Sequence, residues 1–217
     1  PLADLQASGW EHILFTGQKT YNGVAILSKH PLEDPHIGFL DGEDDPQRRL
    51  VRATVNGVRI HCCYVPNGAP VGGPKFRYKL RWIKRLMREL AAHHTPDERL
   101  LVCGDMNIAP TEHDVWDPFE CEGNILFHPQ EHRALKRLKA WGLHDAYRHL
   151  APEDEQSFTW WDYRQMAYQK NWGCRIDHIL VTEPLLGSVE AVTTHQDVRG
   201  WEKASDHCPV EVELDLA

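Results

Sequence analysis

The stretch Leu101-Val102-Cys103-Gly104-Asp105-Met106-Asn107-Ile108-Ala109-Pro110-Thr111 is the most informative part of the sequence. Its short apolar run favours a buried strand, and a glycine and then Asp105 and Asn107 follow that run. If the strand continues to Asn107, its two-residue period places both side chains on one face. An Asx-type turn that caps the strand is the alternative. A carboxylate beside an amide can orient a water molecule and donate to a phosphate oxygen, two tasks of a hydrolase acting at phosphorus.

Similar apolar segments alternate with turn-forming stretches along the rest of the chain. They predict strands over residues 24–27, 50–55, 58–64, 100–103, 176–181, 189–192 and 210–214. Helical spacing of apolar residues predicts two helices, over residues 75–92 and about 129–141. Many strands and few helices predict an α/β or α+β layered domain, with strands in the core and helices outside. No repeat or linker divides the sequence, so we expect residues 1–217 to form a single domain.

Composition and charge narrow the class of protein. The chain has 217 residues, of which 41% are hydrophobic and 26% charged, with a net charge of -8. These values are typical of globular domains, and they argue against a disordered or fibrous protein. No apolar run approaches the roughly 20 residues that cross a bilayer, and the first residues lack the pattern of a signal peptide, so we expect neither membrane insertion nor Sec-type secretion. Six scattered cysteines favour a reduced, cytoplasmic protein.

The negative net charge of the chain disfavours nucleic-acid binding by most of the surface, but it does not exclude binding in a local groove. The segment 75–92 places Lys and Arg residues around an apolar stripe, which we expect in the core. Its cations have two interpretations, a DNA-facing surface and a solvated outer face, and the solvated face is the simpler.

A second acidic residue, Asp177, lies inside the apolar segment Arg175-Ile176-Asp177-His178-Ile179-Leu180. An unpaired carboxylate there would be costly to bury, so Asp177 needs a partner. The segment Ser205-Asp206-His207-Cys208-Pro209 supplies one, because an aspartate that accepts from an imidazole fixes its tautomer and raises its basicity. An exposed turn explains the Ser-Asp-His tripeptide equally well when it is taken alone.

These motifs together are more specific than any one of them. The sequence resembles the exonuclease III branch of the endonuclease/exonuclease/phosphatase family. The resemblance covers essentially the whole chain and rests on Gly104-Asp105-Met106-Asn107 with Pro110-Thr111, Arg175-Ile176-Asp177, Ser205-Asp206-His207-Cys208-Pro209, Gly17-Gln18-Lys19, Gly23-Val24-Ala25-Ile26-Leu27, Gln47-Arg48-Arg49, Tyr64-Val65-Pro66-Asn67-Gly68 and Phe158-Thr159-Trp160-Trp161-Asp162-Tyr163-Arg164.

The resemblance implies a four-layered α/β sandwich, in which two packed mixed β-sheets are flanked by helices. It implies Mg²⁺-dependent phosphodiester hydrolysis: cleavage 5′ to an abasic site, 3′-to-5′ exonuclease action on duplex DNA, and removal of 3′ blocking groups. By this resemblance His207 and Asp177 would pair at the scissile phosphate. Asp105 would position or deprotonate the attacking water, Asn107 would hydrogen-bond the same group, and Tyr64 would contact the phosphate. The resemblance does not decide whether Asp105 or His207 is the general base.

The resemblance also implies a metal site with Asp206, Asp105 and Asn107 as ligands for Mg²⁺, or alternatively Mn²⁺. Hard cations of this kind prefer carboxylate and water oxygens to thiolates. Members of this family begin with strands that carry an Asn and a Gln-Glu pair, whose Glu is the main metal ligand. Neither feature is found here, so we expect an N-terminally incomplete chain that is weakly active or inactive alone. A naturally shortened protein without the metal-binding Glu is the alternative.

For the substrate, the resemblance implies a monomer acting on duplex DNA with abasic sites or 3′ ends. Trp160, Cys174 and Ile176 would line a pocket for the extruded abasic sugar, since an apolar slot admits a baseless sugar and rejects a normal nucleotide. Core packing of Trp160 or Trp161 is the alternative. The candidate contacts to the DNA backbone are Lys19, Arg48, Arg49, Arg164 and Lys203, each of which has an ordinary solvated charge as its alternative.

Two further functions remain open from the sequence. One is a related phosphodiesterase or phosphatase with a substrate other than DNA. The other is a non-catalytic DNA-binding module that keeps the fold but not the metal site.

Overall fold

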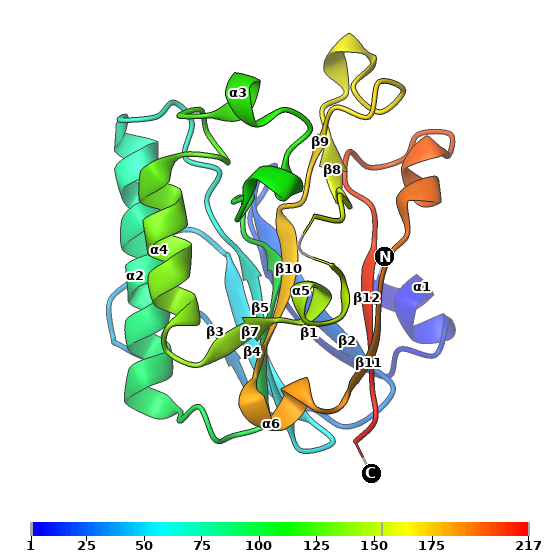
Figure 1. The fold of residues 1–217 in the computed structure, drawn as a ribbon. Coiled ribbons are helices and arrows are strands. Elements are labelled where there is room, and N and C mark those ends of the chain that lie inside the picture. The colour runs from blue at the N-terminus through cyan, green and yellow to red at the C-terminus, as the bar shows by residue number, and fades with distance from the viewer. Residues whose placement is uncertain (1, 153, 217) are drawn as a thin grey trace.

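A six-stranded mixed sheet forms the centre of the protein (Figure 1). The structure is a computed structural model that describes residues 2–152 and 154–216. The sheet has the order β3 (Glu33–Ile37), β4 (Leu50–Val55), β5 (Val58–Tyr64), β6 (Leu100–Asp105), β10 (Asp177–Thr182) and β7 (Leu143–Asp145). Strands β5 and β6 are parallel, and the other neighbours in the sheet are antiparallel.

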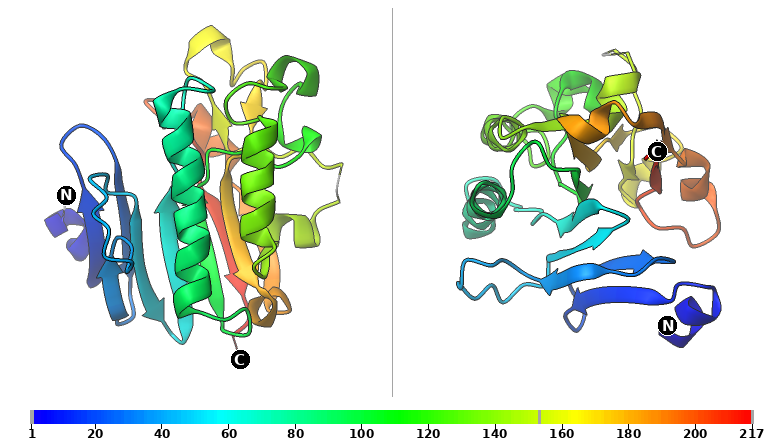
Figure 2. Two further views of the ribbon diagram at one scale, coloured as in Figure 1. Left: turned by 90° about the vertical axis from the view of Figure 1, so that its left-hand side faces the viewer. Right: turned by 90° about the horizontal axis from the view of Figure 1, so that it is seen from below.

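Two long helices cover one face of this sheet, α2 (Pro74–His93) and α4 (Pro129–Lys139) (Figure 2). Both begin with a proline in the first turn, where its missing N–H leaves no helical hydrogen bond unmade. The apolar stripe of α2 packs on the sheet as expected, with Leu86 and Leu90 fully buried against Leu100 and Val102.

The opposite face carries two antiparallel ribbons (Figure 2). One joins β1 (His12–Gly17) to β2 (Gly23–Ser28), and the other joins β11 (Val189–Thr194) to β12 (Val210–Leu214). Apolar clusters lie beneath both ribbons, centred on Val51 and Val181. The mixed α/β architecture is confirmed, and the second sheet of the expected sandwich consists of these two separate ribbons.

Short elements complete the described chain. The bounds of the helices are α1 (Leu2–Ala7), α3 (Pro118–Cys121), α5 (Ala146–Leu150) and α6 (Glu183–Leu186), with 3-10 turns at Glu112–Asp114, Arg164–Met166 and Gln196–Gly200. Two further strands, β8 (Trp160–Trp161) and β9 (Gly173–Cys174), pair with each other beyond the end of the central sheet. Within the described ranges, no helix is both long enough and apolar enough to cross a membrane.

The strands and helices expected from the apolar patterns are all confirmed, within a few residues at each end. Strands β1, β3, β7, β8 and β9 were not predicted from the sequence. Strand β3 contains Pro35 and lies at the exposed edge of the sheet, so it lacks an apolar pattern. Strands β7, β8 and β9 have only two or three residues, too few for any periodicity to show.

Candidate active site

Strand β6 ends at Asp105, and the chain then turns at Asn107, whose φ is 51°. The strand therefore does not continue to Asn107, and the two side chains meet through a turn. The Asn107 backbone N–H donates to Asp105 Oδ1 at 2.8 Å, and Asn107 Nδ2 donates to Oδ2 at 2.7 Å. Asparagine tolerates the left-handed conformation that this turn requires. The Asx-type turn is therefore present, and it also forms the carboxylate–amide pair of Asp105 and Asn107.

Lys79 supports this turn from helix α2, which the sequence analysis did not predict. Its side chain is fully buried, and Nζ donates to the carbonyl oxygens of Asn107 at 2.6 Å and Asn67 at 3.1 Å. Its charge is paired with the buried carboxylate of Glu131 on α4. Asn67 Nδ2 in turn donates to Asn107 Oδ1 at 2.9 Å. The amide of Asn107 is therefore held from several directions, and both helices contribute to its position.

Strand β10 brings the second acidic residue to the same edge of the sheet. Asp177 lies directly opposite Asp105 in the antiparallel pairing of β10 with β6. His207 comes from the loop before β12, and its Nδ1 lies 2.8 Å from Asp177 Oδ2. Its other ring nitrogen, Nε2, forms no hydrogen bond with the described part of the chain and is available to a substrate. The expected imidazole–carboxylate pair is present, and it lies beside the Asp105–Asn107 turn.

Thr159 fixes the backbone at the start of β10, a role that the sequence analysis missed. Its side chain is fully buried, and Oγ1 accepts from the backbone N–H groups of Ile176 at 3.0 Å and Asp177 at 3.1 Å. A buried hydroxyl has no local sequence signal, because only the fold decides which threonine meets a strand end.

The two titratable centres of the site have strongly shifted pKa values. Burial raises the pKa of Asp105 to about 7, and the neighbouring charge of Asp177 adds to this effect, while His207 opposes it. Burial disfavours the imidazolium of His207, but the hydrogen bond and charge of Asp177 outweigh burial and raise the pKa of His207 to about 9. A protonated imidazole and a carboxyl group whose pKa is about 7 therefore lie side by side. Such an arrangement is typical of acid–base sites.

Aromatic side chains border the site on the side of β8. Trp160 is half-buried and donates through Nε1 to Asp206 Oδ2 at 3.0 Å, and its backbone forms a bridge with His207. Trp161 is fully buried and belongs to the core, as the alternative interpretation held. Trp160 also packs against a cluster that contains Cys174 and Ile176, which are 6% and 2% exposed. The three residues expected to line the sugar pocket belong to one apolar cluster, and of the three only Trp160 is partly exposed.

Tyr64 is held at the end of β5, in register with Asp105 on β6. The guanidinium carbon of Arg49 lies 4.5 Å from the centre of the Tyr64 ring, and Arg49 Nη1 donates to the Tyr64 carbonyl at 3.0 Å. Strands β5 and β6 end at Tyr64 and Asp105, and the antiparallel β10 begins at Asp177, so three of the predicted catalytic residues lie at the same edge of the sheet.

A buried ionic network underlies the same edge and was also missed. Arg175 is 1% exposed, and it donates through Nε to Asp114 Oδ1 at 2.7 Å and through Nη2 to Asp145 Oδ2 at 2.9 Å. The buried imidazole of His178 lies between Arg175 Nη1 and the carbonyl oxygen of Ile108, at 3.1 and 2.8 Å. The network ties the loop after Asn107 to the strand that carries Asp177.

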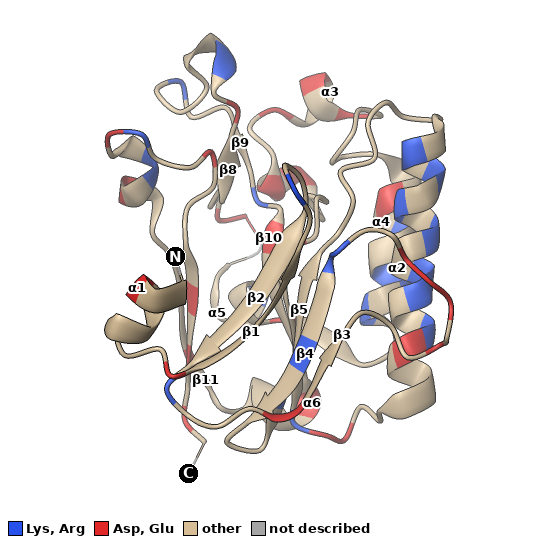
Figure 3. Ribbon diagram, turned by 180° about the vertical axis from the view of Figure 1, so that it is seen from behind, with Lys and Arg blue, Asp and Glu red and all other residues tan. Residues whose placement is uncertain are grey.

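Four of the five expected DNA contacts are exposed on the surface, and the fifth, Arg49, packs against a predicted catalytic residue. Lys19 is exposed in the turn between β1 and β2. Arg164 is exposed after β8, and its guanidinium pairs with Asp162 at 2.6 Å. Arg48 and Lys203 are also exposed, whereas Arg49 is buried beside Tyr64. The cationic residues are otherwise concentrated on helices α2 and α4 (Figure 3).

The described residues do not form a complete metal site on their own. Within the described ranges, no group of three or more His, Cys, Asp or Glu side chains is arranged to hold a metal ion. Both oxygens of Asp105 accept from Asn107, and Asp206 accepts from the indole of Trp160. The ligand roles expected for Asp105, Asn107 and Asp206 therefore stay predictions.

Comparisons with known proteins agree with this geometry. The family model described as "Endonuclease/Exonuclease/phosphatase family" matches residues 2–207. Exodeoxyribonuclease III of Haemophilus influenzae is 33% identical over an alignment of 214 residues that covers 94% of this chain and 80% of the relative. The solved structure of a 3′ phosphatase from Neisseria, bound to a product DNA hairpin, is 39% identical with a TM-score of 0.93, covering 99% of this chain and 83% of that chain. An AP endonuclease from Archaeoglobus fulgidus is 36% identical with a TM-score of 0.94, covering 100% and 83%. The chain therefore belongs to the endonuclease/exonuclease/phosphatase family.

Proposed function

We propose that this protein is a DNA-repair nuclease that hydrolyses phosphodiester bonds, of the exodeoxyribonuclease III and AP endonuclease type. The pairing of Asp105 with Asp177 carries the proposal, because it sets the carboxylate–amide turn beside the His207–Asp177 pair. The proposed reactions are cleavage 5′ to an abasic site, 3′-to-5′ exonuclease action on duplex DNA, and removal of 3′ blocking groups. The names of the similar proteins support all three, since they include an exodeoxyribonuclease III, an AP endonuclease and a 3′ phosphatase.

The chemistry follows from the protonation states of the two centres. His207, with a pKa of about 9, is positively charged at neutral pH. It would stabilise the negative charge that develops on an oxygen of the scissile phosphate. Asp105, with a pKa of about 7, can accept a proton from an attacking water and is the better general base of the two. Asn107 holds the Asp105 carboxylate in place, and Tyr64 would contact the phosphate from the neighbouring strand.

The proposed cofactor is Mg²⁺, with Mn²⁺ as the alternative. Asp105, Asn107 and Asp206 offer the carboxylate and amide oxygens that hard divalent ions prefer. The family to which the chain belongs generally uses a divalent metal, which can stabilise charge on the phosphate and on the leaving oxygen. Isothermal titration with each ion, on the wild-type chain and on Asp206→Ala, measures whether this residue contributes to metal binding.

The proposed DNA site extends from the catalytic edge over β8. We place the extruded abasic sugar against Trp160, with Cys174 and Ile176 as the apolar layer behind it. Lys19 and Arg164 would contact the DNA backbone. The exposed position of both cations supports this role, although Arg164 must exchange its ion pair with Asp162 for a phosphate.

Incision of a fluorescent duplex with one abasic site tests the function. The chain is used in excess, with Mg²⁺ or with a chelator, and it is compared with His207→Ala. Metal-dependent incision 5′ to the abasic site that His207→Ala abolishes, while binding of the duplex is kept, supports the proposal. Undiminished binding without incision in long incubations favours the non-catalytic binding module. Hydrolysis of a phospholipid headgroup in preference to abasic DNA favours the related phosphodiesterase.

The remaining expectations concern the state of the protein. We propose that residues 1–217 act as one domain and as a monomer, supported by apolar clusters that join the central sheet to elements on both faces. One unfolding transition and a monomer mass by light scattering are the expected results. We also propose a reducing, cytoplasmic setting, supported by six free cysteines. Fractionation of cells that express the tagged protein checks the location.

A further inference from the structure

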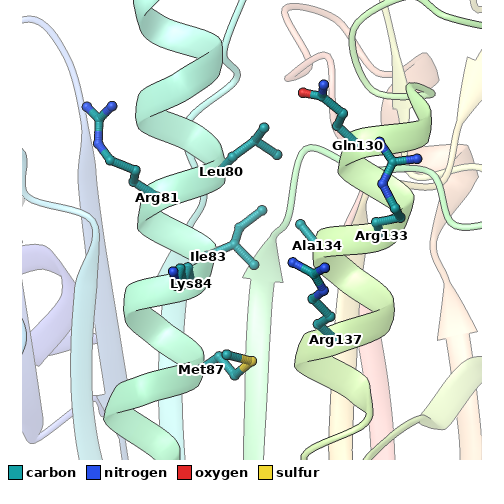
Figure 4. A pocket seen from close by; sticks show the side chains of 9 residues that line it. All are labelled: Leu80, Arg81, Ile83, Lys84, Met87, Gln130, Arg133, Ala134 and Arg137. Carbon is teal, nitrogen blue, oxygen red and sulfur yellow. The ribbon is translucent and has the colours of Figure 1, made fainter.

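A groove of about 350 Å³ lies between helices α2 and α4, away from the catalytic edge (Figure 4). Its floor is aliphatic: Leu80, Ile83 and Met87 of α2 lie across from Ala134 of α4. The residues on the floor span about two helical turns, roughly 10 Å of helix. None of the residues that line the groove belongs to the site proposed for DNA hydrolysis. The groove is therefore a separate surface feature that the proposed reaction does not explain.

The rim of this groove is positively charged. Lys84 on α2 and Arg133 and Arg137 on α4 line it and are exposed, and no lining residue is acidic. None of these three cations forms an ion pair with another described residue. Other cations of α2 do have acidic partners, since Arg85 pairs with Asp41 and Lys79 with Glu131. An unpaired cluster of one sign is notable in a chain whose net charge is -8, because that surface attracts ligands that the rest of the molecule repels.

We propose that this groove binds an acidic peptide segment of a partner protein. An aliphatic side chain of the peptide would pack on Leu80, Met87 and Ala134. The carboxylates of its acidic residues would face Arg133 and Arg137. Charge complementarity argues for an acidic ligand, and the aliphatic floor argues for a peptide. Bases of single-stranded nucleic acid bind by stacking on aromatic rings, and no residue that lines this groove is aromatic. Arginine clusters bind acidic peptide motifs, and apolar grooves bind the apolar side chains of peptides, so this groove combines two known modes of peptide recognition.

Fluorescence anisotropy with a labelled peptide of alternating Asp and Leu residues tests the proposal. The variant Arg133→Glu with Arg137→Glu should weaken binding by about tenfold or more, since it reverses two charges of the rim. The matched control is Arg88→Glu with Lys136→Glu, which makes the same charge change at exposed positions of the same helices outside the groove. This control should bind the peptide close to the wild-type affinity.

Two further measurements test the apolar part. A peptide in which Ser replaces every Leu should bind more weakly than the original. Ala134→Gln narrows the floor without changing charge and should also weaken binding, with circular dichroism confirming that the variant is folded. Incision of abasic DNA should be unchanged in these groove variants, which separates this proposal from the proposed function.

Three results would overturn the proposal. The first is no binding of the Asp-Leu peptide to the wild-type chain, even at low salt. The second is an equal loss of binding in both double variants, which would indicate attraction by net charge alone. The third is a single-stranded oligonucleotide whose affinity falls in Arg133→Glu with Arg137→Glu, while peptide binding does not, which would make the groove a nucleic-acid surface.

Discussion

Asp177 is the neighbour that contributes most to the positive charge of His207, ahead of Asp105 and Asp206. Asp177 accepts a hydrogen bond from the His207 ring and holds the pKa of the imidazole at about 9. Asp177→Asn should move this pKa down toward the ordinary value of 6.5, which NMR titration of the imidazole measures. Turnover on abasic DNA should fall by roughly 100-fold or more, because the imidazole loses both most of its positive charge at neutral pH and the carboxylate that orients its ring.

The control for this substitution is Glu183→Gln, which removes a carboxylate that pairs with the exposed imidazole of His144, beyond the opposite end of β10 from Asp177. It should leave both the His207 titration and the turnover unchanged. An imidazole that still titrates near pH 9 in Asp177→Asn would show that another group controls His207.

Gly104, near the end of strand β6, cannot be replaced by a larger residue without a steric clash. Its φ is 124°, and an added Cβ would lie 2.0 Å from the carbonyl oxygen of Cys63 on the adjacent strand. Gly104→Ala should therefore lower the free energy of unfolding by about 3 kcal/mol through overpacking and strain. Gly123→Ala is the matched control, because Gly123 also has a positive φ but meets no atom within 4 Å.

Urea denaturation measures both glycine variants. We expect a loss of about 1 kcal/mol in Gly123→Ala, from backbone strain alone. Equal losses in the two variants would mean that strand β5 moves aside at no cost.

At the level of elements, helices α2 and α4 are joined by a buried ion pair beneath the catalytic turn. Lys79→Met removes its cation and leaves Glu131 without compensation in the interior. The free energy of unfolding should fall by about 3–5 kcal/mol, the usual result when one partner of a buried pair is lost. Thermal or urea unfolding measures the change, with Lys75→Met on the exposed first turn of α2 as control.

A second substitution separates charge from packing. Adding Glu131→Gln to Lys79→Met should recover part of the lost stability, because the unpaired buried charge is gone. The double variant should still lose turnover, since the carbonyl of Asn107 lacks the donor that held it. If the double variant is less stable than Lys79→Met, the explanation by buried charge is wrong.

At the level of the whole molecule, acid stability should depend on the network around Arg175. Burial disfavours the Asp114 carboxylate, but Arg175 and its hydrogen bonds outweigh burial and lower the pKa of Asp114 far below 3.8. A lowered folded-state pKa stabilises the protein above pH 3.8, and this contribution is lost as the pH falls further. Asp114→Asn should therefore flatten the dependence of unfolding free energy on pH below about 5.

Urea unfolding measured from pH 7 down to the acid transition checks this expectation. Asp97→Asn, at an exposed position, should leave the slope unchanged. An unchanged slope in Asp114→Asn would show that the acid transition is governed elsewhere.

The sequence predicted those parts of the fold that depend on repeating patterns. Both long helices and the strands of five or more residues were predicted from their apolar residues, except β1 and β3. The pair of His207 and Asp177 could also be predicted, because a carboxylate inside an apolar strand requires a partner. The Asp105–Asn107 contact was expected through a continued strand and instead arises through a turn, because asparagine adopts the left-handed conformation.

The residues that position the site could not be predicted from patterns. Lys79 occupies a helical position that is buried, although its neighbours suggested a solvated charge. Its role depends on Glu131, which is distant in the sequence and reaches it only after α4 packs on α2. Arg175 and Thr159 are similar cases, since their partners are brought together by tertiary structure alone.

The pairing of β6 with β10 brings together catalytic residues that lie far apart in the sequence. Asp105 and Asn107 precede the exposed residues 154–156, whereas Asp177 and His207 follow them. A chain divided at that stretch would give two pieces, neither of which has a complete set of catalytic groups. Strand β10 would have to insert between β6 and β7 to restore them. Restored incision of DNA would then report that the two pieces had met, and the protein could serve as a split sensor of association between proteins fused to its halves.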